Sequence, residues 1–81
     1  MKNQYTIKTF GIARDILGGR EVTIEIDGQS VADLRKHLIS NYPQLKELRS
    51  LFIAVNQNYA DDNQGLSESD EIALIPPVSG G

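Results

Sequence analysis

Cysteine does not occur in this chain of 81 residues, which excludes a disulfide framework and any metal site that uses thiolate ligands. Histidine occurs once, at His37, so a bound metal ion would need a site built from oxygen atoms. Long apolar runs are also missing. The longest aliphatic or aromatic run, residues 51–55, is far shorter than the roughly 20 residues that span a bilayer, and residues 1–4 lack the apolar stretch of a signal peptide. We therefore expect a cytoplasmic protein that makes no contact with a membrane.

The chain also lacks a basic surface segment. Its net charge is −3, and its eight Lys and Arg residues are scattered along the sequence. Binding to nucleic acid requires clustered positive charge that neutralises phosphates. Nucleic acid is therefore not an expected partner, and a charged partner is expected to be basic.

The usual arrangements of catalytic residues are absent from the sequence. The serines have no base to form a triad, and Gly18-Gly19 is not followed by the Lys-Ser pair of a phosphate-binding loop. His37 is predicted on the solvated flank of a helix. The acidic residues that follow position 60 do not match the spacing of a calcium loop and are expected to solvate turns; they are Asp61, Asp62, Glu68, Asp70 and Glu71. We expect neither a metal site nor enzymatic activity of the isolated chain.

The pattern of apolar residues predicts one α+β domain over residues 1–75. Strands are expected at residues 4–10, 20–26, 51–56, 59–60 and 71–75, and the strict alternation of Val22, Ile24 and Ile26 is typical of a half-buried strand. Residues 30–42 predict the main helix, with Ser30 as N-cap and Asp33 completing a capping box. Short helical turns are expected at residues 14–17 and after Pro43. One helix on a mixed sheet of about five strands is the β-grasp, or ubiquitin-like, roll.

The second face of this sheet poses a question. In the last strand, Ile72 and Leu74 point to one face while Ala73 and Ile75 point to the other, and Phe10 lies opposite the apolar face of the first strand. A single helix covers only one face. Either short segments fold over the second face, or it is an exposed apolar surface for a partner. The pattern leaves both alternatives open.

Residues 76–81 predict an extended functional tail, with the sequence Pro76-Pro77-Val78-Ser79-Gly80-Gly81. Proline has no N–H and a fixed φ, so Pro76 and Pro77 end strand pairing, and the terminal glycines have no Cβ that would obstruct a narrow channel. A carboxylate on Gly81 is a weak electrophile until ATP converts it into an acyl-adenylate. A sulfur nucleophile that displaces AMP would then leave a thiocarboxylate, which is a competent nucleophile.

The segment "DEIALIPPVSGG" (residues 70–81) closely resembles the C-terminus of the MoaD/ThiS group of ubiquitin-like proteins, which includes the sulfur-carrying subunits of molybdopterin synthases. The resemblance extends over essentially the whole chain. It includes "FGIARDILGG" (residues 10–19), with the group's aromatic–small–x–x–Arg–acid stretch, and "AVN" (residues 54–56). Ser69 departs from the group, many members of which have glycine before Asp70.

The resemblance implies a role as sulfur carrier in molybdenum cofactor biosynthesis. Gly81 would be activated by an ATP-dependent adenylyltransferase similar to ubiquitin-activating enzymes (MoeB-like) and would receive sulfur from a donor protein. The tail would enter the large catalytic subunit (MoaE-like) of a heterotetramer and give its sulfur to cyclic pyranopterin monophosphate, with no cofactor bound permanently to this chain. By position, Phe10, Tyr59 and Ile75 match the group's apolar docking residues, and this favours the partner surface over the covered face.

Three alternatives remain. The same chemistry serves thiamine thiazole synthesis, which the Pro-Pro pair disfavours. A ubiquitin-like modifier would instead let a lysine amine attack the activated Gly81 and form an isopeptide. A plain interaction domain would use only its docking surface and leave the tail idle.

Overall fold

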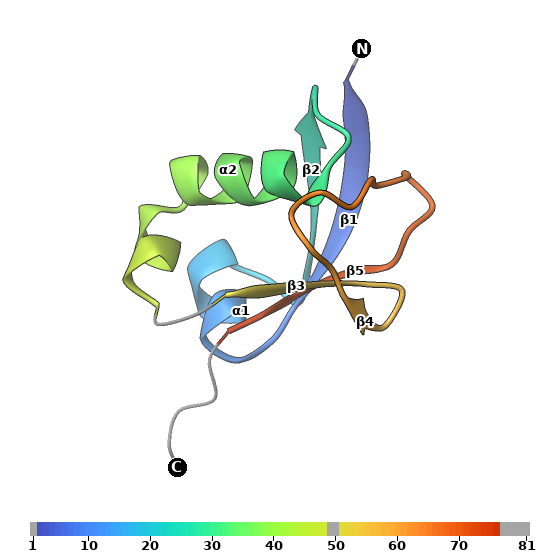
Figure 1. Cartoon of the computed structure of the whole chain (residues 1–81). Coiled ribbons are helices and arrows are strands. Elements are labelled where there is room, and N and C mark those ends of the chain that lie inside the picture. Colours follow the sequence, from blue (N-terminus) through green and yellow to red (C-terminus); the bar gives the residue numbers. More distant parts are fainter. Residues whose placement is uncertain (1, 49–50, 77–81) are drawn as a thin grey trace.

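A computed structural model of the chain describes residues 2–48 and 51–76 (Figure 1). Its centre is a mixed sheet with the strand order β2-β1-β5-β3-β4. β1 pairs with β2, and β3 pairs with both β4 and β5, in antiparallel orientation, whereas β1 and β5 are parallel. The predicted mixed sheet is confirmed. Its strands are β1 (Asn3–Thr9), β2 (Glu21–Ile26), β3 (Phe52–Val55), β4 (Asn58–Tyr59) and β5 (Ile72–Ile75).

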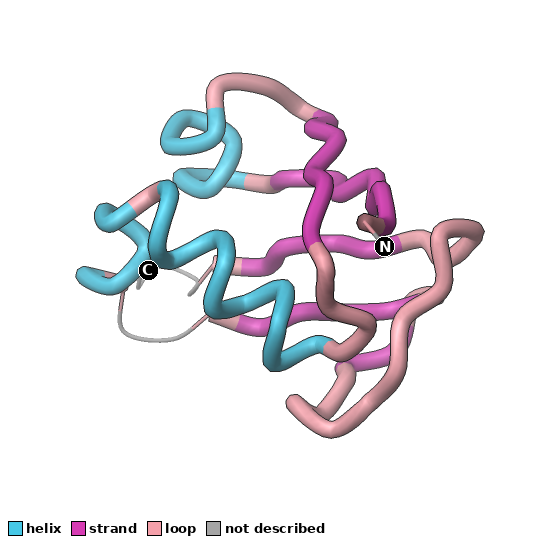
Figure 2. Tube along the Cα trace, turned by 90° about the horizontal axis from the view of Figure 1, so that it is seen from above, coloured by secondary structure: helices cyan, strands magenta, loops and turns pink. Residues whose placement is uncertain are grey.

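Within the described residues, three helices pack on one face of the sheet and form a single core with it. They are α1 (Gly11–Leu17), α2 (Val31–Asn41) and the 3-10 helix η1 (Pro43–Glu47). Figure 2 shows these helices grouped at one side of the molecule, with α2 crossing the strands. No helix within the described ranges is long and apolar enough to cross a bilayer. The largest fully buried side chains are those of Tyr5, Ile7, Val31, Leu34, Leu38, Ile53, Ile72 and Leu74.

The connection between the first two strands is more helical than its sequence predicts. Only residues 14–17 were expected to form a turn, but α1 begins at Gly11, which adopts a left-handed φ of 56°. The predicted stop is confirmed: Gly18, with φ 85°, ends α1, and its N–H donates to the Arg14 carbonyl oxygen at 2.9 Å. Because glycine is typical of loops, Gly11 and Gly18 at the two ends of α1 indicate a loop in the sequence, and the first turn of the helix was therefore not predicted.

The N-terminus of α2 has the predicted cap. The hydroxyl oxygen of Ser30 accepts a hydrogen bond from the Asp33 N–H at 3.2 Å. The second half of the box is displaced by one residue, because the Asp33 carboxylate accepts from the N–H of Gln29 at 3.3 Å and not from that of Ser30. The N-cap prediction is therefore confirmed, and its reciprocal partner is Gln29.

The polar loop after β4 completes the cap. Its carbonyl groups accept from the first two N–H groups of α2: Gln64 from Val31 at 2.9 Å and Asp62 from Ala32 at 3.0 Å. These N–H groups have no partner inside the helix, so the loop satisfies donors that a helix leaves open. The loop is thus a structural part of the domain.

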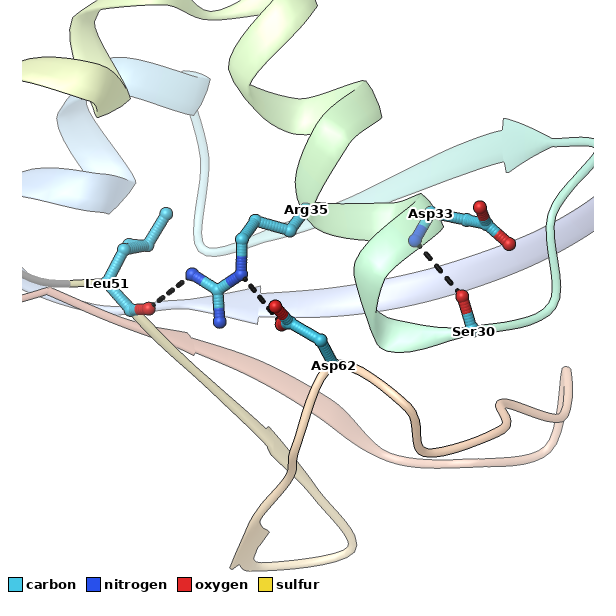
Figure 3. A network of polar contacts seen from close by, with 5 residues as sticks. All are labelled: Ser30, Asp33, Arg35, Leu51 and Asp62. Carbon is cyan, nitrogen blue, oxygen red and sulfur yellow. Dashed lines mark hydrogen bonds and ion pairs between the residues drawn. The ribbon is translucent and has the colours of Figure 1, made fainter.

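Arg35 joins the same loop to the beginning of β3 (Figure 3). One guanidinium nitrogen, Nη1, donates to the carbonyl oxygen of Leu51 at 2.6 Å, and Nε donates to the Asp62 carboxylate at 3.2 Å. A single side chain on α2 thereby holds two segments that are distant in the sequence.

Candidate docking site

The face of the sheet opposite the helices is apolar and exposed over β5, β3, β4 and the end of β1. The exposed fractions are 52% for Phe10, 46% for Phe52 and 69% for Tyr59, while Ile75 and Ala73 are half-buried. We call these five residues the apolar stripe. Large apolar side chains at this exposure show that the described segments do not cover this face, so the alternative of an open surface is confirmed. An exposed cluster of this kind marks a site for a partner.

The register of the strands brings the apolar stripe together. Phe52 of β3 lies directly opposite Ile75 of β5, and Ala54 lies opposite both Ala73 and Tyr59. Side chains of directly opposed residues point to the same face of a sheet. The rings of Phe52 and Tyr59 stack with centroids 5.1 Å apart and an interplanar angle of 16°. Two of the three predicted docking residues, Tyr59 and Ile75, therefore share one surface, with Phe52 between them.

Phe10 joins the apolar stripe from the other side of β5. The parallel register pairs Lys8 with Ala73 and Thr9 with Leu74, so Phe10 comes next, beside Ile75. Phe10 is also the N-cap of α1, with extended backbone angles that keep its side chain alternating with the buried Thr9. All three predicted docking residues thus lie on one face of the sheet.

An ion pair borders the apolar stripe on β1. Nζ of Lys8 lies 2.6 Å from the Glu71 carboxylate, and both side chains are substantially exposed. The hydrogen bond and the charge of Glu71 raise the pKa of Lys8 above its ordinary value. Lys8 stays charged over the physiological range, so the stripe ends at a fixed polar boundary.

The predicted tail begins against the body of the domain. Pro76 is buried, and its Cγ lies 3.4 Å from the position that a Cβ on Gly11 would occupy. The other predicted tail residues, Pro77, Val78, Ser79, Gly80 and the reactive Gly81, lie outside the described residues, so the division into residues 1–75 and 76–81 stays a prediction.

The remaining polar candidates have structural roles. His37 is half-buried, and its Nε2 lies 3.2 Å from the amide nitrogen of Asn41. Glu68 accepts from the N–H of Gln4, and Asp70 accepts from the N–H of Ser67 and the amide of Asn56. Across residues 2–48 and 51–76, no group of three or more His, Cys, Asp or Glu side chains could hold a metal ion.

Two residues of the site were not singled out from the sequence. Phe52 was read only as part of a strand, although its alternation with the buried Ile53 placed it on the second face. Gly11 was read as part of a connection. Its role depends on Pro76, which is 65 positions away in sequence (76 − 11), and no local pattern indicates that contact.

The structure defines the chain as a ubiquitin-like β-grasp protein whose apolar open face lies beside the origin of its C-terminal segment. A family model described as the ThiS family matches residues 7–81, and the chain belongs to this family. The predicted fold and the predicted family are both confirmed.

Three relatives illustrate the range of the similarity. The chain is 35% identical to a molybdopterin synthase sulfur carrier subunit of Chlamydomonas reinhardtii, over 96% of this chain and 99% of that protein. It is similar, with a TM-score of 0.79 and 28% identity, to the small archaeal modifier protein 1 (SAMP1) of Methanosarcina acetivorans, over 100% and 99% of the two chains. It is also similar to a chain in the complex of subunits 1 and 2 of the molybdopterin-converting factor of Helicobacter pylori, with a TM-score of 0.63 and 32% identity over 96% and 99% of the chains.

Proposed function

We propose that this protein is the sulfur-carrier subunit of a molybdopterin synthase. The observation that best supports this function is the contiguity of the apolar stripe with Pro76, where the tail begins. The curated relative with the corresponding name has nearly the same extent as this chain. Docking through the stripe would bring residues 76–81 to the partner at the same time.

In this function, the chemistry takes place on Gly81. Its carboxylate attacks the α-phosphate of ATP on a MoeB-like adenylyltransferase, which forms an acyl-adenylate and releases pyrophosphate. Sulfide released by a sulfur donor protein then displaces AMP, so that the bond to AMP breaks as the C–S bond of the thiocarboxylate forms. The sulfur passes to cyclic pyranopterin monophosphate while water restores the carboxylate of Gly81, and two such donations complete the dithiolene of molybdopterin.

The large catalytic subunit is the partner that fits the apolar stripe. In the Helicobacter pylori complex, a similar chain is associated with subunit 2 of the molybdopterin-converting factor. Phe10, Tyr59 and Ile75 would anchor this chain through their exposed apolar surface, and the catalytic pocket would belong to the large subunit. A heterotetramer of two small and two large subunits, in the cytoplasm, is the assembly that we propose.

Intact mass spectrometry of the protein from its native cells tests this proposal. We expect a fraction of the chains to have one oxygen exchanged for sulfur, and fragmentation should place the exchange on Gly81. A variant with one residue appended after Gly81 is the control, because it keeps the domain but removes the terminal carboxylate from its place. The proposal would be contradicted if the wild-type protein showed no exchange in its native cells and also none when the purified protein is incubated with ATP, the activating enzyme and a sulfide source.

A second function follows from the similarity to SAMP1, whose name describes a protein modifier. In that case an amine of a target lysine attacks the activated Gly81 and forms an isopeptide bond. Detection of conjugates in which the C-terminus of this chain is joined to lysines of other proteins, lost when Gly81 is extended, would favour the modifier. The thiocarboxylate mass without such conjugates favours the sulfur carrier alone.

A further inference from the structure

The two central strands separate at Gly11 and Pro76. β1 and β5 run parallel, and the last hydrogen-bonded pair of residues in their register is Thr9 with Leu74. Two residues after this pair, the backbone that follows β1 turns into α1 at Gly11, and the backbone that follows β5 leaves the sheet at Pro76. Pro76 is nevertheless buried, and its ring occupies the space beside the Cα of Gly11. The tail therefore leaves the domain in contact with the corner between β1 and α1.

Gly11 and Pro76 lie close together. A Cβ on Gly11 would lie 3.4 Å from Cγ of Pro76, at the short end of van der Waals contact. The left-handed φ of 56° at Gly11 also turns the backbone sharply into α1, a conformation that glycine adopts without strain. The ring of Pro76 fixes its own φ as well. Two independent restraints thus act on the residue from which the tail continues.

The same corner belongs to the proposed docking surface. Phe10 precedes Gly11, and Ile75 precedes Pro76, so each of these stripe residues is directly bonded to one half of the contact. When a partner binds Phe10 and Ile75, it also fixes the position of the Gly11–Pro76 contact. Binding and tail placement are then coupled through a rigid corner of the fold.

From this geometry we infer that Gly11 is a positioning residue: its left-handed backbone turns the chain from β1 into α1 against the buried ring of Pro76, and this contact sets the direction in which the tail enters the partner. The inference rests on the proposed function, because it assigns a purpose to the direction of the tail. It predicts that disturbing the contact impairs group transfer within the complex more than it impairs formation of the complex.

Gly11→Asn and Gly18→Asn form a matched pair that tests this inference. Asparagine tolerates a left-handed backbone, so neither change imposes a large strain. Both glycines flank α1 at positive φ, but a Cβ on Gly18 has no neighbour within 4 Å, whereas one on Gly11 faces Pro76. For Gly11→Asn we expect the sulfur-transfer rate constant at saturating partner to fall about tenfold or more, since small misplacements of reacting groups have effects of this size. Affinity for the partner should change by less than about threefold, and Gly18→Asn should leave both quantities near wild type.

A spectroscopic measurement tests the contact without any activity. The chain contains no cysteine, so a double variant Thr23→Cys and Ser79→Cys accepts spin labels only on exposed β2 and on the tail. We expect Gly11→Asn to shift or broaden the distribution of distances between the labels, and Gly18→Asn to leave it unchanged. Pro76→Ala, which removes the ring and keeps Gly11, should act in the same direction and serves if Gly11→Asn does not fold.

Unchanged label distances in both Gly11→Asn and Pro76→Ala would overturn the inference. So would a loss of partner affinity with an unchanged transfer rate constant, because Gly11 would then act only in docking. Failure of the proposed function gives a different result: the wild-type chain acquires no thiocarboxylate, while the label distances still report on the contact.

Discussion

The carbonyl oxygen of Gly28 accepts a hydrogen bond of 3.0 Å from the hydroxyl of Tyr5, whose side chain is 1% exposed. This bond joins the first strand to the turn that precedes α2. Burial, followed by the nearby carboxylates of Glu68, Asp33 and Asp70, raises the pKa of Tyr5 above its ordinary value of 10.0. The neutral phenol is thus favoured by the folded state.

Stability should consequently decrease in alkaline solution. Below the ordinary pKa, Tyr5 is protonated in both states and its stabilisation is fully present; above it, the unfolded chain loses the proton first, so the free energy of unfolding falls until the folded pKa is passed. Lys8, whose pKa is also raised, acts in the same direction. Urea unfolding between about pH 9 and 12 should show this decrease, with a smaller slope in Tyr5→Phe than in wild type. An equal slope in the two proteins would contradict the assignment to Tyr5.

Gly28 itself tolerates no side chain. A Cβ at this position would overlap the side chain of Asp33, including its Cβ, so the start of α2 would have to move. We expect Gly28→Ala to lower the free energy of unfolding by about 1–3 kcal/mol, the range typical of overpacking. Gly65→Ala is the matched control, because its nearest contact would be an ordinary 3.8 Å. Equal denaturation midpoints for the two variants would contradict this prediction, because they would show that the Asp33 side chain can move away at no cost in stability.

The stack of Phe52 on Tyr59 should matter more for binding than for folding. Both rings are exposed, so their removal creates no cavity in the core, whereas aromatic anchors at an interface commonly contribute about 2 kcal/mol or more to affinity. We expect Phe52→Ala and Tyr59→Ala each to weaken binding of the large subunit by at least about tenfold, measured by calorimetry. Thr23→Ala, on exposed β2 but outside the apolar stripe, is the control. The double variant should lose less binding free energy than the sum of the losses in the two single variants, because each ring orders the other.

Arg35 should be more important for stability than its partner Asp62. Arg35→Met removes both the bond to the Leu51 carbonyl and the ion pair, whereas Asp62→Ala removes the ion pair alone. We expect unfolding free energies to fall by about 1–3 kcal/mol for the first variant and less than about 1 kcal/mol for the second. Salt should reduce the contribution of the ion pair, which both variants remove, and leave that of the bond to the Leu51 carbonyl largely unchanged. A larger effect of Asp62→Ala than of Arg35→Met would contradict this order.

The sequence predicts those parts of the structure that depend on local patterns. Alternation of apolar residues places β2, and the three- and four-residue spacing with Ser30 places α2, because a buried face imposes its own period on the chain. The predicted turn is observed at Asn56 and Gln57, both of which have positive φ; asparagine tolerates this conformation, whereas glutamine has no such preference. The docking residues Phe10, Tyr59 and Ile75 came from the family resemblance and not from a local pattern; they lie on one face of the sheet, and their role in docking stays a prediction.

The parts that escaped prediction depend on contacts between distant segments. The stack of Phe52 on Tyr59 requires the register of β3 and β4, and the role of Gly11 requires the position of Pro76. The loop after β4 reads as polar and solvated, but its carbonyl groups cap α2. In each case the residue type is compatible with several structural roles, and only contacts with distant segments determine which role it has.

The position of β5 has a consequence for biosynthesis. This strand is the last one in the part of the chain that the structure describes, yet it is inserted between β1 and β3 in the middle of the sheet. A nascent polypeptide that lacks residues 72–75 has no means of joining the two halves of the sheet, so the domain cannot close until translation has almost reached the tail. Prematurely terminated products would remain open to proteases, and the molecules that survive would be those whose synthesis had passed the central strand.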